Sequence, residues 1–161
     1  FLNEKKTPEE ISLELSKLKA KSISRTKKNI LVVGSDTTIS LNKKLIEKAR
    51  NKKEAKEKIT ALSGKKHTII TSISVYYNNK LVWFKVEKTT VKLRKLNNKE
   101  INNYLKKTGK QILGCVGCYQ VEERGPNIIE NIRGDFFNVM GLPLFSFLSF
   151  LIKQNKKKHD Q

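Results

Sequence analysis

The sequence predicts an α/β fold with a single domain, in which a mixed twisted sheet contains a long antiparallel hairpin and is flanked by helices. The continuous apolar run Ile30–Val33 is typical of a strand that is buried on both faces. Two runs rich in β-branched and aromatic residues, Thr68–Tyr77 and Leu81–Leu93, predict longer strands. Segments with apolar residues at helical spacing flank these strands, and a length of 161 residues fits one domain.

The first helix is expected over Pro8–Ser24. Thr7 and Glu10 have the spacing of a capping box, and Pro8 would occupy the first helical position. The apolar residues that recur at helical spacing in this segment are Ile11, Leu15 and Leu18.

The middle of the chain predicts a second helix and the hairpin. Asn51–Leu62 should form a helix that Gly64 ends, with many lysines on its outer side. Asn78-Asn79 is a short turn signal between the two long runs, so these runs are expected to pair as an antiparallel hairpin. The inward side chains of the helix would be Ala55, Ile59 and Leu62.

The last third of the chain alternates helical and extended patterns. Residues 154–161 are expected to form a basic, disordered tail. The predicted elements before it are a helix over Asn97–Lys107 ended by Gly109, short strands at Val121–Glu122 and Asn127–Ile132, and a helix over Pro143–Lys153.

Asp36 is the first candidate functional residue. It follows the apolar run Ile30–Val33 and is expected just past the carboxyl end of that strand. Ligands of open α/β sheets bind outside the carboxyl ends of strands, so an acid there can hold a metal or activate a water. The alternative is that Asp36 caps a following turn through its side chain, and the pattern alone leaves both interpretations open.

A second candidate segment is Gly134–Leu144, a dense string of turn formers and apolar residues. Asp135 within it can be a metal ligand, although the cap of a helix amino terminus is the favoured role. Pro143 would stand in the first turn of the final helix.

These segments, with the residues between them, resemble the Maf family of nucleoside triphosphate pyrophosphatases. Gly34–Thr38 is similar to the family's Gly-Ala-Asp-Thr segment, and Leu18–Ala20 is similar to the Lys-Ala pair on the preceding helix. Lys48 falls where the lysine of a Gly-Lys-Pro motif is expected. The other matching positions are Leu62–Gly64, His67, Thr71, Val116–Glu122, Gly134-Asp135 and Asn138–Leu144.

The resemblance implies a single Maf-like domain over residues 1–153, with a fold like that of inosine triphosphatase. The family opens with a strand and a Ser-Pro-Arg-Arg turn that grips phosphate, whereas Phe1 stands already close to the first helix. The chain is therefore expected to be a fragment that lacks this strand and turn. The parent protein is expected to be an enzyme, and the fragment itself can be inactive.

The resemblance also implies the reaction, which is hydrolysis of nucleoside triphosphates to a nucleoside monophosphate and pyrophosphate. Modified or non-canonical nucleotides are the expected substrates. Asp36 would be the catalytic acid, orienting the attacking water directly or through a divalent metal, Mg²⁺ or Mn²⁺. Lys19 and Lys48 would hold phosphate oxygens, although most lysines of such a chain only solvate its surface. Thr37 would hydrogen-bond near the base or phosphate, and Glu122 would read the base edge.

The identity of residue 122 suggests which nucleotide base the protein prefers. One branch of the family carries Gln here and prefers dTTP and UTP, whereas Glu resembles the branch that acts on 7-methyl-GTP. A carboxylate only accepts hydrogen bonds, so it suits the N1–H and N2–H donors of guanine. The chain departs from the family pattern at three positions, with Gly114 and Cys115 in place of a polar pair and Ala49 in place of a proline. These departures leave the preferred base open.

The two cysteines, Cys115 and Cys118, form a single C-x-x-C. A structural zinc site needs four ligands, and His67 and His159 supply no second pair. A redox pair would be expected to open a helix, whereas this segment is typical of a turn that leads into a strand. We expect reduced thiols packed close to the nucleotide pocket.

The net charge of +19 suggests nucleic acid as a partner. Only five of the 34 basic residues are Arg and the lysines are scattered, so a solvated surface is favoured. A basic nucleic-acid-binding protein or a non-catalytic interaction protein remains the alternative function. No apolar stretch reaches the length of a bilayer span, so no membrane partner is expected. A cytoplasmic location is expected, and a homodimer is left open.

Overall fold

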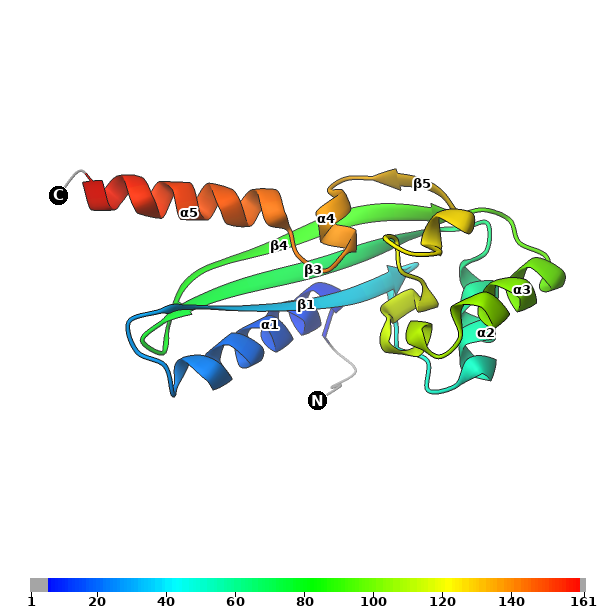
Figure 1. Cartoon of the computed structure of the whole chain (residues 1–161), viewed down its shortest axis with the longest axis horizontal. Coiled ribbons are helices and arrows are strands. Elements are labelled where there is room, and N and C mark those ends of the chain that lie inside the picture. Colours follow the sequence, from blue (N-terminus) through cyan, green and yellow to red (C-terminus); the bar gives the residue numbers. More distant parts are fainter. Residues whose placement is uncertain (1–5, 160–161) are drawn as a thin grey trace.

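Five antiparallel strands form one sheet in the order β2-β1-β3-β4-β5 (Figure 1). The structure, a computed structural model, describes residues 6–159, the last three by their backbone alone. The strands are β1 (Leu31–Leu41), β2 (Lys44–Ile46), β3 (Lys66–Tyr77), β4 (Lys80–Leu93) and β5 (Ile129–Arg133).

The α/β class, the long hairpin and the flanking helices are confirmed, but the sheet is not mixed. Every pairing among the described strands is antiparallel. Asn42-Lys43 joins β1 to β2 and Asn78-Asn79 joins β3 to β4, and two-residue connections can only join antiparallel neighbours. All four turn residues have φ between 48° and 65°, as the favoured hairpin turns require.

Helices cover the sheet unevenly. In Figure 1, α1 lies along one face, α4 lies on the opposite face, α2 and α3 lie together at one end, and α5 extends beyond the other end. The helices are α1 (Pro8–Ser24), α2 (Lys52–Leu62), α3 (Asn98–Thr108), α4 (Phe136–Val139) and α5 (Leu144–His159), and the 3-10 turns are η1 (Gln111–Gly114), η2 (Val116–Cys118) and η3 (Gly125–Asn127).

The predicted capping box begins α1. Thr7 Oγ1 accepts a hydrogen bond from the Glu10 amide at 3.3 Å, and the Glu10 carboxylate accepts one from the Thr7 amide at 2.8 Å. The face that α1 buries differs from its apolar pattern, because Leu18 is exposed and Ile11 and Leu15 are only half-buried. The side chains that α1 buries are Pro8, Ser12, Ser16, Ala20 and Ser24.

Small side chains let α1 approach the sheet closely. Ser12 Oγ lies 2.6 Å from Ser72 Oγ, and Ser16 Oγ lies 2.7 Å from Ser74 Oγ. At Gly34 a Cβ atom would lie 2.4 Å from the Ser16 carbonyl oxygen. Hydroxyl pairs and a glycine therefore replace the large apolar contacts that the sequence pattern suggested.

The main apolar core lies at the other end of the sheet, between the strands, α2 and α3. Ala55, Ile59 and Leu62 of α2 are fully buried there, as predicted. Gly64 follows the end of α2 with φ of +69°, and Gly109 ends α3 with φ of +65°. The helix ends predicted from these glycines are confirmed.

The prediction that Ile30–Val33 is buried on both faces is wrong. Leu31 is 43% exposed and Val33 41%, whereas Val32 between them is buried. α1 covers one face of this part of β1, and the other face is left open to solvent. β2 pairs only with Ile39–Leu41, so β1 residues 31–38 have no partner on their outer edge among the described strands.

Two further predictions near the carboxyl end of the chain differ from the structure. Val121–Glu122 forms a turn and not a strand, because the Glu123 and Gly125 amides both donate to the Gln120 carbonyl oxygen. α5 continues to His159, so the predicted helix end at Lys153 falls six residues early. Lysines beyond that point are good helix formers and do not end a helix. The predicted disorder of residues 160–161 lies outside the described residues.

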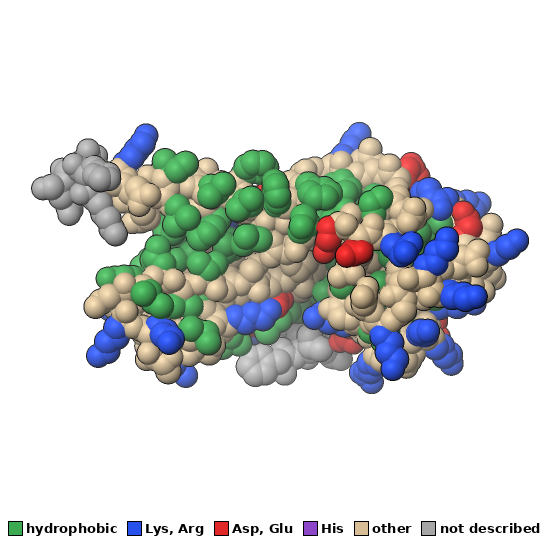
Figure 2. Space-filling view, in the orientation of Figure 1, with side chains coloured by type: hydrophobic (Ala, Val, Ile, Leu, Met, Phe, Trp, Pro, Cys, Tyr) green, Lys and Arg blue, Asp and Glu red, His purple; other side chains and the backbone are tan. Residues whose placement is uncertain are grey.

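Apolar side chains gather on part of the surface. Figure 2 shows them over α5 and the adjoining strands, whereas Lys and Arg side chains crowd the end that carries α2 and α3. No helix within residues 6–159 has both the length and the apolar content that a membrane span needs. Exposed apolar residues of α5 and β1 include Leu31, Val33, Phe145, Leu148 and Ile152.

Candidate active site

A cavity of about 630 Å³ lies at the outer edge of β1. Asp36 and Thr38, which point toward α1, and Ser35 and Thr37, which point to the opposite face, all line it. The cavity therefore reaches both faces of β1 around its unpaired edge. Its other walls come from α1, from residues 45–48, from residues 114–122 and from residues 139–141.

All five site residues proposed from the sequence line this one cavity, although they come from distant parts of the chain. They are Lys19, Asp36, Thr37, Lys48 and Glu122. Their shared position is a structural finding, and their individual roles remain predictions.

Asp36 lies in the middle of β1, and not past the end of the strand as expected. β1 continues to Leu41 because Thr37, Thr38 and Ile39 are β-branched and pair with β3 throughout. The argument from strand ends therefore does not apply, and the site is instead an edge site. The Asp36 side chain is 15% exposed and faces the cavity.

Lys19 of α1 forms an ion pair with Asp36. Its Nζ lies 2.5 Å from Asp36 Oδ1 and 3.1 Å from the Ser35 carbonyl oxygen. The close packing of α1 on β1 places these side chains together. Lys19 therefore holds the Asp36 carboxylate in one orientation, while its own side chain stays 57% exposed at the cavity rim.

Thr37 is held by a chain of hydroxyls. Thr71 Oγ1 donates its single proton to the Asn138 carbonyl oxygen at 2.8 Å. Thr37 Oγ1 lies 2.9 Å from Thr71 Oγ1, so Thr37 must be the donor in that contact. The lone pairs of Thr37 Oγ1 remain free to accept a hydrogen bond from a ligand in the cavity.

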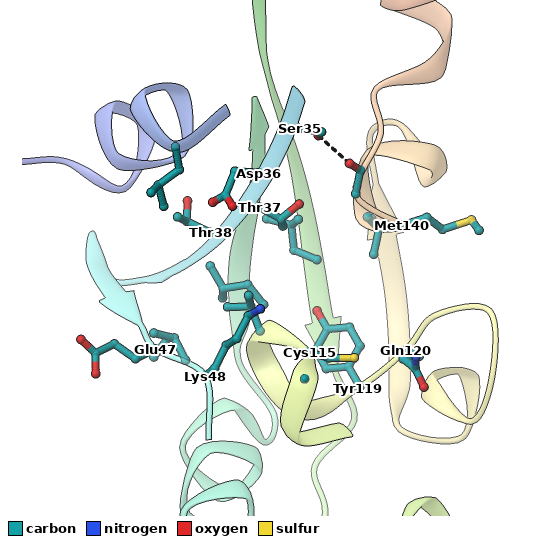
Figure 3. A pocket seen from close by; sticks show the side chains of 18 of the residues that line it. Ser35, Asp36, Thr37, Thr38, Glu47, Lys48, Cys115, Tyr119, Gln120 and Met140 are labelled. Atoms are coloured by element: carbon teal, nitrogen blue, oxygen red, sulfur yellow. Dashed lines mark hydrogen bonds between the residues drawn. The ribbon is translucent and has the colours of Figure 1, made fainter. Parts of the chain in front are cut away.

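Lys48 follows β2 and extends into the cavity, whereas the neighbouring Glu47, which also lines the cavity, directs its carboxylate outward (Figure 3). Lys48 forms no ion pair within the described part of the chain. Its ammonium group is therefore available to an anionic ligand.

Glu122 lines the cavity from the turn after Tyr119. Burial raises the pKa of the Cys115 thiol, the charge of Glu122 raises this pKa further, and the charge of Lys48 opposes both effects. Both charges therefore act across the same region of the cavity as Cys115. Burial also raises the pKa of Cys118 to about 11, and both cysteines are free thiols, as predicted.

Tyr119 and Gln120 are lining residues that sequence reasoning missed. The Tyr119 hydroxyl lies 2.6 Å from His67 Nε2, and the two rings meet edge to face. Burial lowers the pKa of His67 to about 4, so this imidazole is neutral near pH 7. The sequence did hold a signal for these residues, because His67 and Val116–Glu122 both match motifs of one family. The match did not show that His67 and Tyr119 are in contact.

Few side chains around the cavity could act as ligands of a metal ion. Residues 6–156, whose side chains the structure describes, contain no cluster of three or more His, Cys, Asp or Glu side chains that could hold an ion. Asp135 serves as the helix cap, since its carboxylate accepts a hydrogen bond from the Phe137 amide at 2.8 Å. Asp36 is left as the one predicted metal ligand that faces the cavity.

Fold and cavity together define an α/β protein in which carboxylates, lysines and hydroxyls surround an edge site of an antiparallel sheet. The family described as Maf-like protein matches residues 2–154, and the chain therefore belongs to this family. The resemblance inferred from the motifs is confirmed.

Three bacterial relatives illustrate the similarity. A 7-methyl-GTP pyrophosphatase of Bartonella quintana is 36% identical over 143 residues, covering 89% of this chain and 72% of the relative. A protein of the same description from Rhizobium meliloti is 37% identical over 145 residues, covering 90% and 73%. A nucleoside triphosphate pyrophosphatase of Caulobacter vibrioides is 34% identical over 151 residues, covering 94% and 75%.

Proposed function

We propose that this protein hydrolyses nucleoside triphosphates to a nucleoside monophosphate and pyrophosphate. Membership of the Maf-like family and the descriptions of the relatives support this activity. The structural observation that carries it is the meeting of Asp36, Lys19, Thr37 and Lys48 in one cavity large enough for a nucleotide. A nucleic-acid-binding protein or a non-catalytic interaction protein is less well supported.

Asp36 is the proposed acceptor for the attacking water. Its carboxylate is fixed by Lys19 and faces the cavity, so it can orient a water molecule toward the α-phosphorus. Lys48 would hold oxygens of the departing pyrophosphate, which carries the negative charge that develops during cleavage. Thr37 would accept one hydrogen bond near the base or phosphate, because its own proton is donated to Thr71.

A divalent metal, Mg²⁺ or Mn²⁺, is the proposed cofactor. Four carboxylates and two lysines line the cavity, so the charges of a bound triphosphate exceed the positive charge around it. Mg²⁺ is commonly held by one or two carboxylates together with substrate phosphates. Asp36 with phosphate oxygens fits this mode, and the ion would neutralise phosphate charge when bound.

The finer proposals concern the base, the assembly and the location. Glu122 would accept hydrogen bonds from guanine N1–H and N2–H, which favours guanine nucleotides such as 7-methyl-GTP. The two relatives from Bartonella and Rhizobium are 7-methyl-GTP pyrophosphatases, which supports this choice. A cytoplasmic location and a homodimer remain predictions.

The activity is tested by pyrophosphate release from a panel of 7-methyl-GTP, GTP, CTP, UTP and dTTP. Each nucleotide is incubated with the protein and Mg²⁺, Mn²⁺ or a chelator. We expect metal-dependent release that the chelator stops. Absence of release from every nucleotide with either metal would count against the proposed activity of this chain.

A further inference from the structure

One wall of the cavity, the segment Val139–Gly141, is attached to the sheet by hydroxyl groups. Ser35 Oγ of β1 donates to the Gly141 carbonyl oxygen at 2.7 Å, the contact dashed in Figure 3. Thr71 Oγ1 of β3 donates to the Asn138 carbonyl oxygen at 2.8 Å. Two neighbouring strands therefore hold two successive parts of this wall.

The Ser35 proton has two candidate acceptors. The Gly141 carbonyl oxygen is at 2.7 Å and the Ser72 carbonyl oxygen is at 3.1 Å. A hydroxyl has one proton, and the shorter contact lies at the favoured distance for an O–H donor. Ser35 therefore bonds to Gly141, which also lines the cavity and lies 106 residues away in the sequence.

The wall is stiff within itself, and Val139 is its one apolar residue that packs, partly buried, against the core. The Gly141 amide donates to the Asn138 carbonyl oxygen and the Leu142 amide to that of Phe137, both at 3.1 Å. Gly141 has φ of +101°, a conformation that favours glycine. Phe137 and Met140 are exposed, so their burial adds little to the attachment. Val139 and the Asn138 side chain, which donates to Thr89 of β4, hold the start of the turn, and Ser35 makes the hydrogen bond that joins Gly141 to β1.

We propose that Ser35 is a positioning residue whose hydroxyl sets the distance between β1 and the wall Val139–Gly141. This proposal rests on the proposed function, because the wall faces the space assigned to the nucleotide. Ser35 directly precedes Asp36, so one strand carries both the proposed water-orienting acid and the attachment of the opposite wall. Loss of the hydroxyl would leave the Gly141 carbonyl oxygen without this donor and let the wall move outward.

The test compares Ser35→Ala, Ser35→Thr and the control Ser149→Ala. Thr keeps the hydroxyl, and Ser149 is an exposed residue of α5 whose hydroxyl donates only to the Phe145 carbonyl oxygen. We measure kcat and KM for the best nucleotide of the panel. We also measure hydrogen exchange at the amides of Met140–Leu142, which are all bonded within the turn.

We expect Ser35→Ala to raise KM about 2- to 10-fold, which is the effect expected from the loss of one hydrogen bond. The value of kcat should change by less than about 2-fold. Amide exchange at Met140–Leu142 should become faster in the same variant. Ser35→Thr should restore both values, and Ser149→Ala should match the parent.

Parental KM and exchange in Ser35→Ala would overturn the proposal. It would also be overturned if Ser35→Thr were as impaired as Ser35→Ala, because the hydroxyl would then not be the cause. The exchange measurement needs no turnover. A parent protein without hydrolysis would therefore contradict the proposed function, while exchange still decides whether Ser35 holds the wall.

Discussion

At the scale of single residues, Asp36 gains its orientation from a side chain that the sequence analysis assigned to phosphate. Lys19 binds the Asp36 carboxylate at 2.5 Å and the Ser35 carbonyl oxygen at 3.1 Å. A lysine so placed can still meet a phosphate at the cavity rim, because more than half of its side chain is exposed. The pair is thus both an orienting contact and a neighbouring positive charge for the substrate.

Replacing Asp36 by Asn should remove most of the activity and leave the fold intact. The amide has nearly the same volume but cannot take a proton from water, and loss of a general base costs about 10²- to 10⁴-fold in rate. The measurements are kcat/KM and the melting temperature. A folded Asp36→Asn protein with turnover within a few fold of the parent would show that another group orients the water.

Replacing Glu122 by Gln tests how the base is read. One guanine donor would then face an amide N–H, and a buried unpaired donor costs about 1 to 3 kcal/mol, or about 5- to 150-fold in kcat/KM. Pyrimidine triphosphates should lose less, because an amide can both donate and accept. The five-nucleotide panel is measured with parent and variant in competition. An unchanged ranking would mean that Glu122 does not contact the base.

At the scale of elements, local signals predicted the start of α1, the ends of α2 and α3 and the hairpin turn, but not the end of α5 or the turn at Val121–Glu122. Thr7 with Glu10 caps α1 as predicted, because a cap needs only residues three apart, and Asn97 with Glu100 caps α3 in the same way although the sequence analysis did not name this cap. Asn78-Asn79 forms the hairpin turn for the same reason. The buried face of α1 was not predictable from its apolar spacing, since it depends on Gly34 and two serines of β3.

The close approach of α1 to β1 makes a prediction for Gly34→Ala. The added Cβ would lie 2.4 Å from the Ser16 carbonyl oxygen and 2.6 Å from the Ala20 amide nitrogen. Backbone atoms cannot rotate away, so α1 must shift, and overpacking of this kind costs about 1 to 3 kcal/mol. Urea unfolding measures the loss.

The matched control for that variant is Gly114→Ala, where a Cβ would meet nothing within 4 Å. Its free energy of unfolding should stay close to that of the parent. If Gly34→Ala were as stable as Gly114→Ala, the helix would not be packed on β1 as described.

At the scale of the whole molecule, the fold class was predictable and so were five residues that meet at one cavity, but the position of that cavity was not. Asp36, Lys48 and Glu122 were found by motif, and motifs carry no distances. The edge site arises because β1 continues past Asp36 and β2 pairs only with its end. Contacts such as Ser35 to Gly141 join segments that no local pattern connects.

The buried His67 predicts how stability depends on pH. Burial lowers its pKa to about 4 in the folded protein, below the ordinary value of 6.5. Above pH 6.5 the His67 imidazole is neutral in both the folded and the unfolded chain, so its burial does not lower the free energy of unfolding. Between pH 6.5 and 4 only the unfolded chain takes up the proton, so the free energy of unfolding falls by about 2 kcal/mol by pH 5.

The check is urea unfolding at pH 7 and pH 5 for the parent, His67→Gln and His67→Asn. Neither variant titrates at this position, so each should lose less stability than the parent over this interval. The carboxyl groups of Glu9, Glu10 and Glu100 have lowered pKa values and titrate below pH 4.5, outside the interval. Equal losses in all three proteins would show that His67 is not buried in its neutral form.

The central claim is that water attacks the α-phosphorus of a nucleoside triphosphate in the cavity beside Asp36. The most direct measurement is the reaction in ¹⁸O-labelled water with the products resolved by phosphorus NMR and mass spectrometry. Attack at the α-phosphorus yields a nucleoside monophosphate that carries one ¹⁸O and an unlabelled pyrophosphate. A nucleoside diphosphate with labelled orthophosphate, or label in the pyrophosphate, would contradict it.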